Sequence, residues 1–205
     1  MFGLFSAQNE QKEGHLFSEP SMAETYRDIL RDHSLRRINR IIENDTFVDS
    51  SSVYERFFLD CKAEIRVVAR GIKKEIFDRP NVIAAAERFL GKDSARLVLD
   101  IRAKNSEDAY NTSTTEFFRA ISDSASGSDR LQVKFYHEVE SDTFLGDLPS
   151  VSFGDGRMYR KRSYQKEGDY TTHANADVNF NDKDTVLMLT ELIDKALGKE
   201  KVLDF

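Results

Sequence analysis

Cysteine and tryptophan are nearly absent from this sequence, which has one cysteine and no tryptophan among its 205 residues. A single cysteine excludes an internal disulfide framework and any cysteine-rich zinc site. Cys61 follows the apolar run 57–59 in a segment with a helical pattern, so we expect a buried structural thiol. The four histidines are few and scattered. The sequence therefore predicts neither a metal site nor a cofactor.

Long hydrophobic runs are missing as well. The apolar start, residues 1–5, is followed at once by the polar residues 8–10, so it is too short for a signal peptide or a membrane span. We therefore expect a cytoplasmic protein without a membrane partner. Basic residues number 30 against 36 acidic ones, for a net charge of −6. This balance argues against a general nucleic-acid-binding protein but leaves room for a local basic face.

The pattern of the chain predicts an α/β fold with a helical extension in front. Residues 1–20 lack periodicity and are expected to be mobile, whereas 21–43 have the spacing of one or two amphipathic helices. We assign 21–49 to a helical extension and 50–205 to one α/β domain. Expected helices are 53–61 (capped by Ser51 or Ser52), 81–90, 114–121 and 182–197; expected strands are 64–69, 95–101, 131–136 and 172–180, with a hairpin at 150–162.

The hairpin is the segment that most resembles a catalytic strand. Apolar and small residues alternate from Leu148 to Gly154, and Asp155-Gly156 is a strong signal for a two-residue turn. Nevertheless, no histidine, cysteine or lysine comes just before this turn. No glycine-rich phosphate loop follows any of the expected strands either.

A few residues remain as candidates for catalysis. His137 and His173 fall at strand ends, which border the functional crevice of α/β sheets, and each has acidic neighbours that could orient it as a general base. The alternative is that both are partly exposed loop residues. Asp100, Asp155 and Asp182 also lie at strand ends or turns, where carboxylates can hold magnesium. A turn and a helix cap explain Asp155 and Asp182 more simply.

Two basic clusters suggest binding. The hairpin carries an anion-binding candidate set, interleaved with tyrosines suited to base stacking: Arg157, Arg160, Lys161 and Arg162. The first helical segment carries a partner-binding candidate set: Arg36, Arg37 and Arg40. The alternative for the hairpin is a solvated face balanced by acids elsewhere.

The order of elements resembles that of phospholipase D-like domains. The run 57–80, followed by 82–90 and 95–101, is similar to the start of such domains, and 174–180 is similar in place to their Gly-Ser-x-Asn strand. The hairpin looks like the family's catalytic strand, whose motif is His-x-Lys, four residues, then Asp. The resemblance puts Asp155 on the motif's aspartate, Leu148 on its histidine and Ser150 on its lysine. Leucine cannot act as a nucleophile, and serine carries no positive charge for a phosphate.

The resemblance implies a phospholipase D-like mixed sheet flanked by helices that has lost hydrolysis. We expect a non-catalytic binding or regulatory subunit that contacts nucleic acid or another polyanion. Two alternatives stay open: a diverged nuclease or phosphodiesterase that uses His137 or His173 with Asp155, and a protein-interaction accessory subunit, for example of a bacterial defence or toxin system. The family habit of pairing single-motif domains also implies a homodimer as one arrangement.

Overall fold

A mixed β-sheet forms the centre of this computed structural model, in which residues 22–103, 105–137, 150–162, 173–198 and 202 are described. Its strand order is β1-β7-β6-β5-β2-β3-β4. The strands are β1 (Ile42–Thr46), β2 (Glu64–Ala69), β3 (Arg96–Ala103), β4 (Leu131–His137), β5 (Val151–Gly154), β6 (Met158–Arg162) and β7 (His173–Asn179). β2, β3 and β4 are parallel, and β5, β6, β7 and β1 join by antiparallel pairing.

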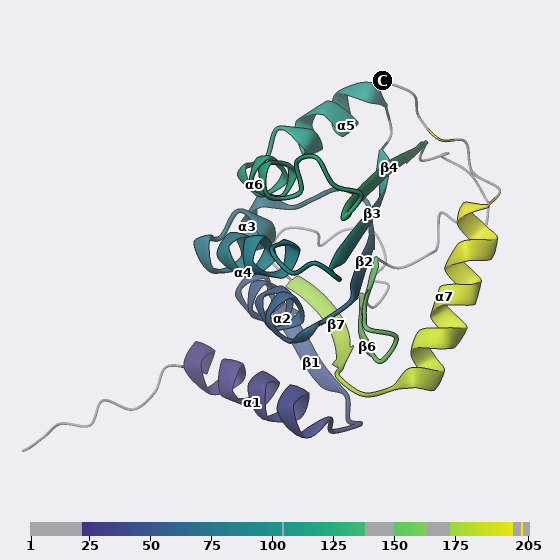
Figure 1. The fold of residues 1–205 in the computed structure, drawn as a ribbon. Coiled ribbons are helices and arrows are strands. Elements are labelled where there is room, and N and C mark those ends of the chain that lie inside the picture. Colours follow the sequence, from purple (N-terminus) through teal and green to yellow (C-terminus); the bar gives the residue numbers. More distant parts are fainter. Residues whose placement is uncertain (1–21, 104, 138–149, 163–172, 199–201, 203–205) are drawn as a thin grey trace, which may run out of the picture.

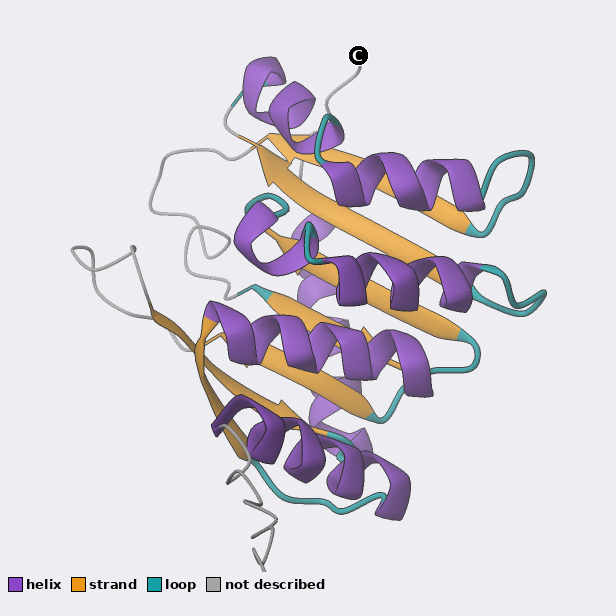
Figure 2. Cartoon of the chain, turned by 90° about the vertical axis from the view of Figure 1, so that its left-hand side faces the viewer, coloured by secondary structure: helices purple, strands orange, loops and turns teal. Residues whose placement is uncertain are grey.

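Helices cover the two faces of the sheet unequally. They are α1 (Met22–Arg36), α2 (Phe47–Asp60), α3 (Lys74–Phe77), α4 (Pro80–Leu90), α5 (Ser106–Ser113), α6 (Glu116–Ser124) and α7 (Lys183–Leu197). Figure 1 shows α7 alone on one face and the other helices on the opposite face. Figure 2 looks onto the crowded face, where the long helices lie roughly side by side across the strands. The fold is therefore three layers deep.

The main core lies between the sheet and the crowded helical layer. Its largest fully buried side chains include Phe57, Phe58, Phe89 and Phe117, which make a chain of tilted and edge-on ring contacts with their neighbours. A smaller apolar cluster on the other face joins Phe153 and Tyr159 to Leu189 and Ile193 of α7. The second cluster explains how a single amphipathic helix closes that face.

The predicted α/β class and phospholipase D-like mixed sheet are confirmed, and most predicted elements appear within a few residues of their expected bounds. The hairpin is also confirmed. Asp155 and Gly156 have φ values of 49° and 62°, so both central residues of the turn are left-handed, as Asp-Gly favours. Residues 1–20 and Leu148 lie outside the described residues.

The region before α2 differs from expectation. α1 ends at Arg36, and residues 42–46 form edge strand β1, paired with β7, where a helix was expected to reach Glu43. α2 starts six residues early, because Thr46 and Asp49 form a capping box. Ser51 and Ser52 are therefore inside the helix, where their hydroxyls donate to the carbonyl of Val48. Residues of the predicted extension thus belong to the sheet.

Candidate functional site

One end of the sheet gathers the segments that the sequence marks as functional. The parallel strands β2, β3 and β4 finish there, β6 finishes at Arg162, and β5 and β7 begin there. Ser150, just before β5, is part of this end, and its carbonyl accepts a hydrogen bond from the Arg162 backbone N–H at 2.9 Å. Gly71, with φ of 116°, turns the chain as it leaves β2. Ligand crevices in α/β folds lie at such carboxyl ends.

Two cations meet at this end from different parts of the chain. Lys73 follows β2 and Arg162 ends β6, and both are half-buried. Burial lowers the pKa of Lys73, and the charge of Arg162 lowers it further against the opposing effect of Glu75. The Lys73 Nζ also lies 5.0 Å from the centre of the Phe47 ring, in the first turn of α2.

This arrangement favours an anion. Two like charges that depress a pKa repel each other, and a bound oxyanion relieves that repulsion while accepting charge-assisted hydrogen bonds. The amino end of α2 adds its partial positive charge beside Phe47. We name Lys73 and Arg162 the cation pair. Lys73 was not among the candidates from the sequence, although a glycine and two lysines directly after a buried strand were a usable signal.

Arg160 lies in the interior of the protein. It is 4% exposed; its Nε donates to Oδ1 of Asn44 at 2.9 Å and its Nη2 donates to Oγ of Ser50 at 3.0 Å. Its Cζ lies 5.6 Å from the centre of the Tyr54 ring, whose hydroxyl in turn bonds Ser152. Arg160 therefore ties β6 to β1 and α2, and its guanidinium is turned away from solvent.

The four predicted anion-binding residues do not share one face. Side chains alternate along β6, so Arg160 and Arg162 point toward α2, whereas Lys161 points toward the α7 side with Tyr159. Arg157 sits at the opposite end of the strand, where its guanidinium donates to the carbonyl of Phe180. The expected surface of four cations is thus divided, and Arg162 is the member that joins the cation pair.

Asp155 is held by the backbone that leads into β2. Its Oδ2 accepts from the N–H of Lys62 at 2.8 Å, and its Oδ1 accepts from those of Ala63 and Glu64 at 2.9 and 3.1 Å. The Asp155 N–H donates to the Glu64 carbonyl at 2.9 Å. A carboxylate with three such donors is a structural anchor of the turn.

The catalytic candidates lie far apart in the fold. His137 ends β4, and His173 begins β7 beside Thr46, so three or more strands separate them within the sheet. Both lie at the end of the sheet that carries the cation pair, whereas Asp155 lies at the opposite end of β5. The topology therefore keeps Asp155 away from both histidines.

The acidic residues considered for magnesium have other roles. Asp182 accepts from the Thr185 N–H at 3.1 Å as the N-cap of α7. Asp100 is 2% exposed and accepts from Arg66 Nε at 2.7 Å. No group of three or more His, Cys, Asp and Glu side chains is placed to hold a metal ion within the described residues.

A polar network on the α7 face was not apparent from the sequence. Arg66 bridges Asp100 and Asp194, the latter at 2.6 Å from α7. Burial raises the pKa of Tyr136 to about 12, with further contributions from the charge of Asp100 and the hydrogen bond to it. These contacts join sheet residues far apart in the sequence to the last helix, so only the folded chain reveals them.

The partner-binding candidates on α1 are exposed. Arg36 pairs with Asp32 at 2.7 Å, one turn earlier in the helix. Arg37 has a left-handed backbone with φ of 54°, and Arg40 follows in the connection to β1. Among the described helices, none is both long and apolar enough to cross a membrane.

Comparison with known proteins supports the fold. No protein-family model matches the sequence, and no curated protein matches it. Nuc from Salmonella typhimurium, a phospholipase D family member, is similar in structure, with a TM-score of 0.50 and 14% identity over 82% of this chain and 100% of that one. The archaeal chromatin protein TrmBL2, whose structure shows a novel mode of DNA binding, has a TM-score of 0.51 and 12% identity. That match covers 87% of this chain and 61% of TrmBL2.

Proposed function

We propose that this chain is a non-catalytic polyanion-binding protein on a phospholipase D-like scaffold, with nucleic acid as the ligand class and the cation pair as its main contact. The observation that carries the proposal is the depressed pKa of Lys73 beside Arg162 at the carboxyl end of the sheet. A phosphodiester placed there neutralises both cations at once. The similarity to a DNA-binding chromatin protein is consistent with this choice of ligand.

The non-catalytic part of the proposal rests on three positions. Leu148 and Ser150 stand where the family motif has its histidine and lysine. Asp155, the one matching residue, already accepts three backbone hydrogen bonds. A nucleophile, a fixed cation and a partner for either histidine are therefore missing from the motif positions.

The test is binding of a fluorescein-labelled single-stranded oligonucleotide, measured by anisotropy over a range of salt concentrations. We expect weak binding, and the Lys73→Ala/Arg162→Ala variant should reduce the slope of log K against log salt by roughly 1 to 2, since each lost phosphate contact contributes about 0.7–0.9. Arg119→Ala, at an exposed arginine of α6, is the matched control. Affinity and slope unchanged in the double variant would contradict the cation pair. Oligonucleotide cleavage by the wild type would contradict the loss of catalysis.

A protein partner at α1 is a second candidate function. Ile29, Leu35 and Ile41 are 43%, 68% and 53% exposed, next to the three arginines at the end of α1. Large exposed apolar side chains beside cations are typical of interaction surfaces. A second copy of the chain is one such partner.

Point substitutions are needed to test this surface. Deletion of residues 1–45 would remove most of β1 and Asn44, the acceptor for Arg160. We expect Leu35→Asp/Arg36→Asp to reduce self-association in sedimentation or capture of an accessory partner while the protein remains folded. Leu187→Asp, at an exposed position of α7, is the control. Unchanged association in the first variant would remove α1 as the interface.

A further inference from the structure

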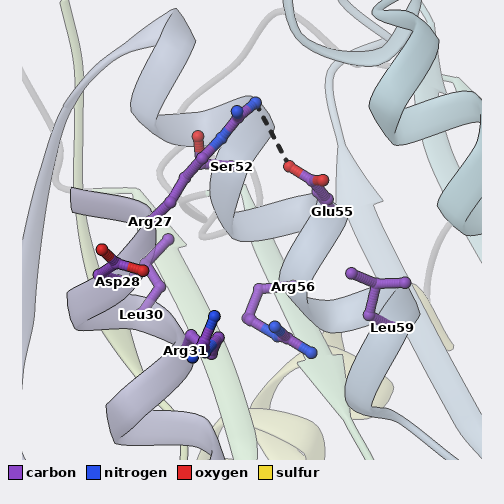
Figure 3. A pocket seen from close by; sticks show the side chains of 8 residues that line it. All are labelled: Arg27, Asp28, Leu30, Arg31, Ser52, Glu55, Arg56 and Leu59. Carbon is purple, nitrogen blue, oxygen red and sulfur yellow. Dashed lines mark ion pairs between the residues drawn. The ribbon is translucent and has the colours of Figure 1, made fainter. Parts of the chain in front are cut away.

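A pocket between α1 and α2 has a lining that is unusual for an acidic protein. Its volume is about 140 Å³, and three of its lining residues are arginines: Arg27 and Arg31 from α1 and Arg56 from α2. The carboxylates in the lining are Asp28 and Glu55, so positive charge exceeds negative charge there. Figure 3 shows the Arg27–Glu55 pair at one end of the pocket, and Arg31 and Arg56 facing the same space toward the other end.

The carboxylates do not satisfy all of these cations. Arg27 lies 3.5 Å from Oε2 of Glu55, but the same oxygen accepts a closer hydrogen bond, of 2.7 Å, from Asn81. Asp60 pairs with Nη2 of Arg56 from within α2. The charge of Arg56 is therefore compensated on its far side, and that of Arg27 only at long range.

Two donors at the pocket remain without partners in the described part of the chain. The Nε of Arg56 is buried and makes no hydrogen bond there. Arg31 makes no hydrogen bond or ion pair with any described residue. A buried unsatisfied donor costs free energy, and native proteins rarely keep one unless water or a ligand completes it. The pocket offers room for that group, since its volume equals that of several water molecules at roughly 30 Å³ each.

We propose that this pocket binds a phosphate group, either as inorganic phosphate or as the phosphate of a nucleoside monophosphate. Guanidinium groups from two helices present several N–H donors at different angles, which suits a tetrahedral oxyanion with three accepting oxygens. A planar carboxylate has only two oxygens and leaves donors unmatched. Arg31 is exposed, so one side of the pocket is open and the rest of a larger ligand can extend into solvent. The residues involved are distinct from the cation pair.

The test follows the side-chain Nε–Hε signals of Arg56 and Arg31 by NMR during titration with sodium phosphate at constant ionic strength. We expect saturable shifts that Arg31→Gln weakens by about tenfold or more in apparent Kd, because a charge-assisted hydrogen bond is lost. Arg31→Lys should restore part of the affinity. Arg119→Gln, at an exposed arginine outside the pocket, should bind phosphate as the wild type does.

Two comparisons separate the remaining outcomes. Titration with adenosine 5′-monophosphate identifies the source of the phosphate: tighter binding than inorganic phosphate indicates a nucleotide, and equal binding indicates free phosphate. The Lys73→Ala/Arg162→Ala variant should keep the Arg56 shifts, so loss of oligonucleotide binding and loss of this site are distinguishable. The proposal is overturned if phosphate produces no saturable shift of Arg56, if equimolar sodium acetate produces the same shift, or if Arg31→Gln leaves the titration unchanged.

Discussion

Oδ1 of Asp155 accepts a hydrogen bond from the backbone N–H of Ala63 at 2.9 Å, across 92 residues of sequence. The contact fastens the β5–β6 turn to the chain just before β2, and two further N–H groups share the same carboxylate. The residue that best matches a catalytic motif in the sequence is therefore used to set the register of an antiparallel strand pair. This finding directs the first prediction to stability instead of activity.

Asp155→Ala should lower the free energy of unfolding by about 1–3 kcal/mol, because three backbone donors lose a charged acceptor and a left-handed residue gains strain. Denaturant unfolding monitored by circular dichroism measures the change. Asp93→Ala, an exposed aspartate near the same edge, should change stability by less than about 0.5 kcal/mol. If Asp155→Ala is as stable as Asp93→Ala, the anchoring role is wrong.

Gly154 and Cys61 form a tightly coupled pair in the core. A Cβ on residue 154 would lie 2.5 Å from the Cys61 sulfur, and Cys61 is fully buried. We expect Gly154→Ala to destabilise the protein by about 1–3 kcal/mol through overpacking. The same change in a Cys61→Ala background should cost less, because the clashing atom has gone. A double-mutant cycle measures this coupling, and strictly additive free energies would argue against the contact.

Arg160→Ala should destabilise the protein by about 2–4 kcal/mol, since it leaves buried groups on Asn44 and Ser50 without their donor. Thermal and denaturant unfolding give the magnitude. Arg119→Ala, exposed on α6, is the matched control and should be near neutral. An Arg160→Ala protein with wild-type stability and reduced oligonucleotide binding would instead place Arg160 at the ligand.

Lys73 should lose its proton at a lower pH than an ordinary lysine, because burial and Arg162 both disfavour its charge. Between its lowered pKa and the ordinary value of about 10.4, the unfolded state binds more protons, so this residue makes stability rise with pH in that window. A bound polyanion favours the charged form, so binding should take up protons in the same window.

NMR titration of the Lys73 side chain tests these statements. Arg162→Gln should move the pKa of Lys73 part of the way back toward its ordinary value, since burial remains after the repelling charge is removed. Arg157→Gln, at the far end of β6, serves as the control and should leave the titration as it is. The same titration curve in wild type and Arg162→Gln would rule out the cation pair.

Local pattern was sufficient to predict much of this fold. The period-2 segments at 64–69 and 131–136 became β2 and β4, and Asp-Gly predicted the hairpin turn, because side-chain alternation and left-handed backbone preference are properties of short stretches. β1 was missed for the opposite reason. Its sequence, IENDT, has little strand propensity and becomes a strand by pairing with β7.

The candidate site was harder to predict, since its residues are brought together from distant segments. Clustered cations at 157–162 suggested one surface, but alternation along β6 and burial by α2 separated Arg160 and Lys161 from Arg162. Lys73 joins Arg162 only because β2 and β6 flank β5 in the sheet. No spacing along the sequence encodes that proximity.

The sequence alone determined the α/β class, the order of the main elements, the hairpin turn and the absence of a His-x-Lys pair before Asp155. These depend on residue type and on neighbours within a few positions. Only the tertiary structure decided which cations meet, that Asp155 anchors β2, that Arg160 is interior and that arginines of α1 and α2 share a pocket. Those outcomes depend on strand order and on which face each side chain takes, and long-range pairing sets both.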